Sequence, residues 1–200
     1  MAFENITLTG YIASPDDFAY YPSLTPAAIS SIKKMLSPFY APISLKMRKM
    51  REIRDAMVAD GVTDHFEIKL IKALKPVAYM RDGEDVYFSL GLLAMKSPLA
   101  TLPVCLHELS HVILSRLDGY TDLKALQREF RASYGDDPDC ELMSPIEFYA
   151  DLIAFFILVK AYEASETKKE KKRLSRVIAH RNEKLLAARA ALERIKQKNI

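Results

Sequence analysis

The feature that most constrains this chain is a pair of histidines inside an apolar segment, LPVCLHELSHVIL at residues 102–114. His107 and His111 are four residues apart, Glu108 lies between them, and the whole chain has only four histidines. On an α-helix, this spacing separates the two side chains by about 40° around the axis and roughly 6 Å along it. Both imidazoles can therefore reach one metal ion if the segment folds as a helix.

Glu108 lies on the same side of that helix, beside His111. There its carboxylate can accept a hydrogen bond from a metal-bound water without binding the metal itself. Zinc lowers the pKa of its bound water towards ~7, and a neighbouring carboxylate can take the proton and deliver it to a leaving amine. The pattern therefore predicts a zinc site with Glu108 as general base and acid; a structural pair of core histidines is the alternative.

A catalytic zinc site needs a third protein ligand. The longer three-histidine motif would place a histidine at position 117, which is Leu117 in this chain. Glu147 and Asp151 instead share one face of a second apolar helix, where two carboxylates are costly to bury without partners. We expect Glu147 to be the third zinc ligand and Asp151 to accept the free ring N–H of a ligand histidine.

Glu147 also has a structural interpretation. Ser144, Pro145 and Glu147 fit the S-P-x-E pattern of a capping box, in which the glutamate serves the start of the helix. Asp151 lies beyond the first turn, where capping no longer helps, and this favours the ligand interpretation.

Hydrophobic periodicity and turn signals predict an α+β fold, mainly helical, with a small antiparallel sheet and a long C-terminal helix. A hairpin is expected at residues 76–90 around Asp82-Gly83, and its strand nearest the histidines is a candidate to line a substrate cleft. Residues 70–75 fit either a helix or a strand. Helices are expected at residues 25–38, 44–61, 101–119 (with Pro103 near its start), within 120–143, at 144–162 and from there to the C-terminus.

The chain divides into a compact domain at residues 1–163, with the N-terminal helices, the hairpin and the two site helices, and a basic helical extension at 164–200. Residues 161–200 contain 12 Lys/Arg and 5 Asp/Glu, a balance of +7.

The most apolar window, residues 152–159, is too short to span a membrane. Without a secretory pattern at the N-terminus and with only two cysteines, the chain is expected in the cytoplasm.

The basic extension has apolar residues at alternating spacings of three and four, as in a coiled coil. This seam comprises Leu174, Ile178, Leu185, Ala188, Leu192 and Ile195, and Arg181 occupies the remaining seam position. The pattern predicts packing on the chain's own domain, on a second copy or on another partner, with nucleic acid as the less favoured partner. Removing residues 164–200 is therefore expected to leave the metal site intact.

The segments HELSH and EFYAD together resemble the gluzincin metallopeptidases, which carry H-E-x-x-H on one helix and E-x-x-x-D on a later one. The segments are also similar to the small ImmA/IrrE-type peptidases, which cleave bacterial regulators, and to the zincin-like domain of plasmid antirestriction proteins. The resemblance covers about residues 85–160. ImmA/IrrE-type proteins often have Asn at the last position of the second motif, and their downstream motif is absent here.

The resemblance implies His107, His111 and Glu147 as zinc ligands, Glu108 as the catalytic residue and Asp151 as the partner of a ligand histidine. The expected function is a zinc-dependent metallopeptidase that acts on a protein or peptide, with the zinc-bound water activated by Glu108. The alternative is a mobile-element or regulatory protein with a non-catalytic zinc site and a tail that binds nucleic acid or a protein partner. An accessible cleft beside residues 76–90 would favour the peptidase.

A peptidase also needs a group that stabilises the oxyanion, and the chain offers several candidates. Tyr120, Tyr134 and His65 remain open on sequence grounds. Tyr149 points about 160° away from Glu147 on the same helix and is therefore disfavoured.

Overall fold

The computed structural model describes residues 42–61, 63–81, 85–95, 98–116, 120–135, 138 and 141–198. It confirms the α+β class, mainly helical with a small sheet and a long C-terminal helix. The helix expected at residues 25–38 lies outside the described residues. The elements, in chain order, are α2 (Ile43–Ala59), β1 (Ile68–Ile71), β2 (Ala78–Arg81), β3 (Asp85–Ser89), α3 (Leu90–Ala94), α4 (Pro98–Ser115), α5 (Tyr120–Tyr134), the 3-10 helix η4 (Glu141–Met143), α6 (Pro145–Glu163) and α7 (Lys168–Lys198).

The sheet is mixed, with strand order β1-β3-β2. Strands β2 and β3 pair antiparallel, with Met80 opposite Val86, as the hairpin prediction requires. Strand β1 pairs with β3 in parallel, with Ile68 opposite Val86, so the expectation of a purely antiparallel sheet is corrected. Residues 70 and 71, left open between helix and strand, belong to β1. A parallel pair is a long-range contact that leaves no local pattern in the sequence.

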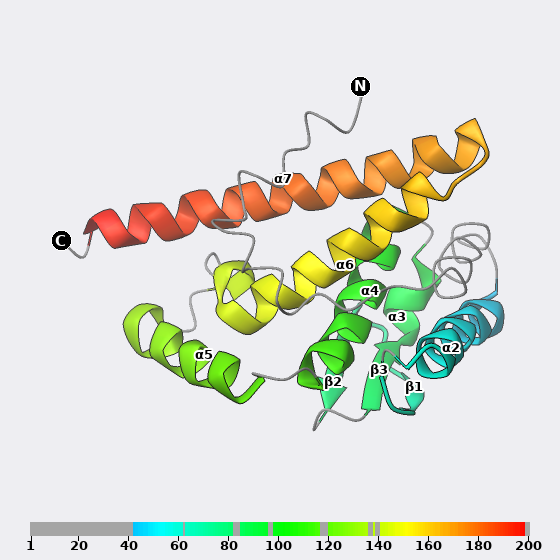
Figure 1. Cartoon of the computed structure of the whole chain (residues 1–200), viewed down its shortest axis with the longest axis horizontal. Helices are drawn as coiled ribbons and strands as arrows, with labels where there is room; N and C mark the ends of the chain where they lie inside the picture. Colours follow the sequence, from blue (N-terminus) through cyan, green and yellow to red (C-terminus); the bar gives the residue numbers. More distant parts are fainter. Residues whose placement is uncertain are drawn as a thin grey trace.

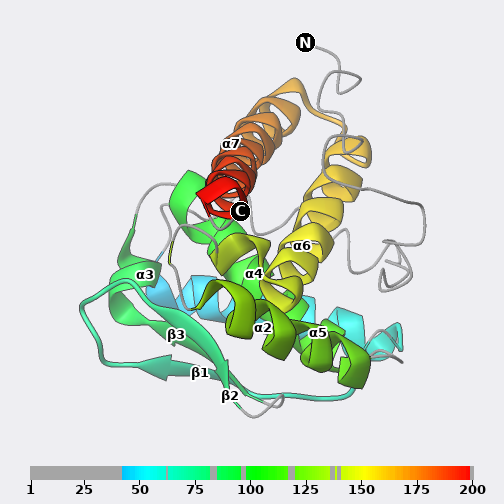
Figure 2. The same cartoon turned by 90° about the vertical axis from the view of Figure 1, so that its left-hand side faces the viewer.

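Helix α4 occupies the centre of the molecule, between the sheet on one side and α6 and α7 on the other (Figure 2). Many of its apolar side chains are fully buried, including Leu102, Leu106, Leu109 and Ile113, and Val104 is partly buried. The helix begins at Pro98, so Pro103 lies inside it and not near its start, which corrects the predicted boundary. Its apolar surroundings on several sides explain why the helix carries almost no polar face.

Helix α7 runs the length of the molecule across α6 (Figure 1). Leu174, Val177 and Ile178 are fully buried and belong to the same hydrophobic core as α4 and α6. Leu185 and Ala188 continue this buried face. The predicted seam therefore packs within the chain at these positions, whereas the division at residue 163 and a partner for residues 164–200 stay predictions.

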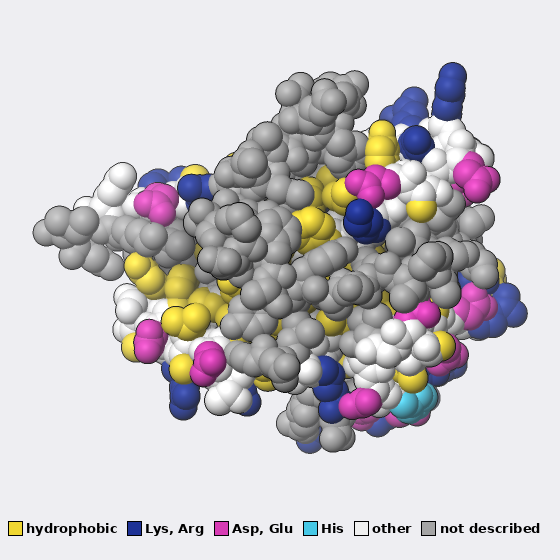
Figure 3. Space-filling model, in the orientation of Figure 1, with side chains coloured by type: hydrophobic (Ala, Val, Ile, Leu, Met, Phe, Trp, Pro, Cys, Tyr) yellow, Lys and Arg dark blue, Asp and Glu magenta, His cyan; other side chains and the backbone are white. Residues whose placement is uncertain are grey.

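The opposite side of α7 is strongly basic near its start. Lys and Arg side chains project from the end of the molecule where α6 passes into α7 (Figure 3). Lys168, Lys169, Lys172 and Arg176 are exposed there. Among the helices in the described part of the chain, none combines the length and apolarity that crossing a membrane requires.

Candidate metal centre

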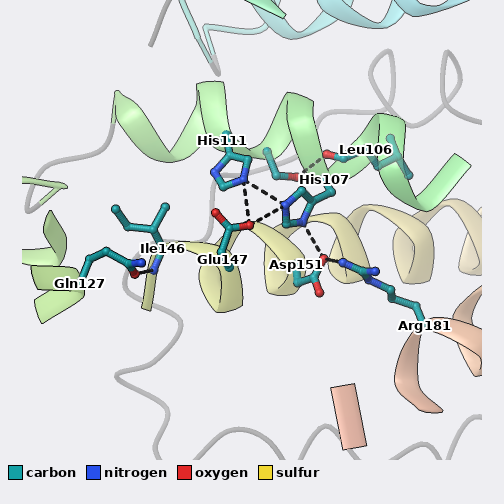
Figure 4. A network of polar contacts seen from close by, with 9 residues as sticks. Leu106, His107, His111, Gln127, Ile146, Glu147, Asp151 and Arg181 are labelled. Atoms are coloured by element: carbon teal, nitrogen blue, oxygen red, sulfur yellow. Dashed lines mark hydrogen bonds and ion pairs between the residues drawn. The ribbon is translucent and has the colours of Figure 1, made fainter. Parts of the chain in front are cut away.

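The fold brings His107, His111 and Glu147 together at the contact between α4 and α6 (Figure 4). The Nε2 atoms of the two histidines are 3.0 Å apart. Glu147 Oε2 lies 3.0 Å from His107 Nε2 and 3.4 Å from His111 Nε2. The sequence predicted these three residues as metal ligands, and their candidate donor atoms form one compact triangle.

This triangle fits a tetrahedral zinc ion. Zinc bound at ~2.0–2.1 Å holds its tetrahedral ligand atoms about 3.3 Å apart, close to the three distances above. The histidine side chains are only 10% exposed and the Glu147 side chain 26%, so the donors are shielded on most sides but accessible from one. Two imidazoles and one carboxylate are also a donor set found in catalytic zinc sites.

Asp151 contacts the ring nitrogen of His107 that is not part of the donor triangle. Its Oδ1 accepts a hydrogen bond from His107 Nδ1 at 2.7 Å, as expected for a carboxylate that orients a ligand histidine. The Asp151 side chain is fully buried. With Nδ1 carrying the proton for Asp151, the opposite nitrogen of His107 faces His111 and Glu147.

Burial and the charges of neighbouring groups set the pKa values of these residues. Although burial lowers it, the carboxylates of Asp151 and Glu147 raise the pKa of His107 to about 10. Burial opposes ionisation of Glu147, but its contacts with His107 and His111 hold the pKa of its carboxyl well below the usual range. In the metal-free protein, the positive charge of a protonated His107 therefore holds the two carboxylates together.

Glu108 lines a cavity of about 350 Å³ beside β2. His111 and Glu147 line the same cavity, together with Met80 of β2, Tyr120 of α5 and neighbouring side chains. Burial raises the pKa of Glu108, and the nearby histidines oppose this rise. A carboxylate with a raised pKa next to the donor triangle suits a group that must both accept and release a proton.

The capping box, the alternative interpretation of Ser144 and Glu147, does not form. Ser144 is the N-cap residue of α6 but makes no side-chain cap hydrogen bond, and the Glu147 carboxylate contacts the histidines. Instead, Gln127 of α5 accepts a hydrogen bond from the backbone N–H of Ile146 at 3.0 Å. Helix α5 therefore supplies the cap and fixes the first turn of α6, which carries Glu147.

The three candidates for oxyanion stabilisation lie in different places. Tyr120 lines the cavity, and burial together with the charge of Glu147 raises its pKa, which keeps the phenol protonated. Tyr134 packs against Phe130, with the two rings tilted, at the other end of α5. His65 is exposed and contacts Glu67. Of the three, Tyr120 is the residue that lines the same cavity as Glu108.

Sequence reasoning missed Arg181 of α7, which forms an ion pair with Asp151 (Figure 4). The available signal was its cationic side chain in an otherwise apolar seam, since a buried charge requires a partner. Residue spacing alone does not identify that partner, because the two residues lie on separate helices.

Comparisons of this chain with family models, with curated proteins and with solved structures found no match.

Proposed function

We propose that this protein is a zinc-dependent peptidase that hydrolyses peptide bonds in a protein or peptide substrate. The observation that carries the proposal is the shared cavity: a candidate general base, two candidate metal ligands and a candidate oxyanion donor all line it. A zinc site with only a structural role has no need of a second carboxylate that lines the cavity without binding the metal.

In this proposal His107, His111 and Glu147 hold the zinc. The ion supplies Lewis acidity and, at neutral pH, an activated water. Glu108 accepts the proton of the attacking water and passes it to the leaving amine, for which its raised pKa is suited. Tyr120, which lines the same cavity, donates a hydrogen bond to the developing oxyanion.

Strand β2 is suited to align an extended substrate. Within the described sheet it pairs with β3 on one side only, and Ala78, Tyr79 and Met80 line the cavity. An extended peptide can add to such an edge through backbone hydrogen bonds. A peptide bound in this way would have a carbonyl in the same cavity as Glu108, in line with the cleft expected beside residues 76–90.

A cytoplasmic location belongs to the same proposal. Cys105 is a buried free thiol, and a chain with two cysteines has little use for an oxidising compartment.

The test is the Glu108→Gln variant, which keeps the size of the side chain but cannot take a proton. Zinc-loaded wild type and variant are incubated with a peptide library from a digested proteome, and new termini are counted by mass spectrometry. We expect the variant to retain zinc and lose cleavage by ~10²–10⁴-fold, the usual contribution of a general acid–base group.

Glu129→Gln is the matched control, because Glu129 is exposed on α5, outside the cavity lining and the donor triangle. Equal cleavage by wild type and Glu108→Gln would refute the assignment of Glu108. No cleavage by zinc-loaded wild type would favour the non-catalytic alternative.

A further inference from the structure

Arg181 is a cation in the middle of the buried face of α7. Its neighbours on that face, Ile178 and Leu185, are 0% and 5% exposed, and the Arg181 side chain itself is only 11% exposed. A guanidinium in such a place is costly unless it is paired. The reason for its presence must therefore lie in what it contacts.

The contact is with the buried carboxylate of the metal centre. Arg181 Nη2 pairs with Asp151 Oδ1, the same oxygen that accepts the hydrogen bond from His107 Nδ1. The chain Arg181–Asp151–His107 thus links α7, α6 and α4 and ends at a candidate zinc ligand (Figure 4). It connects the C-terminal helix to the metal centre through two polar contacts.

Both contacts of the Asp151 carboxylate use the same oxygen atom. Asp151 Oδ2 is buried and has no hydrogen-bond partner among the described residues, so both contacts of the carboxylate converge on Oδ1. With Arg181 present, the carboxylate is fixed from two sides, and its charge is offset within a buried site. Without Arg181, His107 alone would hold the carboxylate, which could then rotate and take the imidazole with it.

We propose that Arg181 is a positioning residue of the metal centre, through which α7 fixes the orientation of His107. The inference rests on the proposed zinc site and adds that residues 164–200 are part of it. This reverses the expectation from sequence that the basic extension can be removed without loss of the metal.

The experiment compares zinc affinities, measured by competition with a chromophoric chelator, in the full-length chain. Arg181→Gln removes the charge, and Arg181→Met replaces it with an apolar side chain that suits the buried face, while His107 still partners Asp151. Arg181→Lys restores the charge. Arg189→Gln is the matched control, because Arg189 is exposed on the same helix.

We expect Arg181→Gln and Arg181→Met to bind zinc about tenfold more weakly, the lower end of the range for partners outside the ligand set, with Arg181→Lys in between and Arg189→Gln unchanged. The cobalt-substituted proteins provide a readout that a loss of stability alone would not alter. The visible absorption bands of Co²⁺ should shift in Arg181→Met but not in Arg189→Gln, because the orientation of His107 changes.

Zinc affinity within twofold of wild type, with an unchanged cobalt spectrum, in Arg181→Met would overturn the proposal for Arg181 and leave the zinc site in place. Failure of the wild type itself to bind zinc would instead refute the metal centre, and with it this inference.

Discussion

Removing the Asp151 carboxylate should destabilise the metal-free protein strongly. Asp151 is fully buried between His107 and Arg181, so Asp151→Ala leaves a guanidinium with a largely buried side chain without its counter-charge. Breaking a buried ion pair by removing one partner costs about 3–5 kcal/mol. For a chain of this length each kcal/mol shifts Tm by about 2–4 °C, so Tm should fall by roughly 6–20 °C.

The assay is thermal unfolding of the metal-free protein followed by circular dichroism. The double variant Asp151→Ala/Arg181→Met removes both charges and serves as the control. If the penalty comes from the unpaired guanidinium, the double variant should recover a substantial part of the lost Tm. A Tm for Asp151→Ala within about 3 °C of wild type, or no recovery in the double variant, would refute the reasoning.

Two further predictions concern the same site. Tyr120→Phe should lower kcat by about 10²–10³-fold with zinc affinity unchanged, the effect of losing one oxyanion donor, and an unchanged kcat would exclude this role. In the metal-free protein, Asp151 and Glu147 raise the pKa of His107 to about 10 against the opposing effect of burial. The protonated ring therefore stabilises the fold fully below its ordinary pKa of 6.5, and this contribution is lost as the pH rises towards 10. Thermal scans from pH 6 to 10 should show a falling Tm in wild type and a flatter profile in His107→Gln, and parallel profiles would contradict the assignment.

The parts of the site that follow from short-range patterns could be predicted from the sequence. The spacing of His107 and His111 and of Glu147 and Asp151 places each pair on one helical face, and the cost of burying charge requires the two faces to meet. The structure brings these four residues together at the contact between α4 and α6. The hairpin of β2 and β3 was likewise visible in local turn chemistry.

The parts that were missed depend on contacts between distant elements. The parallel pairing of β1 with β3, the cap that Gln127 supplies to α6 and the ion pair of Arg181 with Asp151 each join segments whose association has no periodic signature. The capping box at Ser144 shows the opposite case, because a correct local pattern lost to a tertiary contact. Glu147 contacts two histidines of α4, and Gln127 caps the helix instead of the Ser144 side chain.

The most direct test of the central claim is the metal content of the purified protein, measured by elemental analysis after zinc is offered and excess is removed. Wild type, Glu147→Ala and the cavity control Glu141→Ala are analysed side by side. We predict about one zinc per chain in wild type and in Glu141→Ala, because His107, His111 and Glu147 complete a three-ligand site, and much less in Glu147→Ala. No zinc in wild type would mean that the two histidines are structural, and equal zinc in wild type and Glu147→Ala would mean that Glu147 is not a ligand.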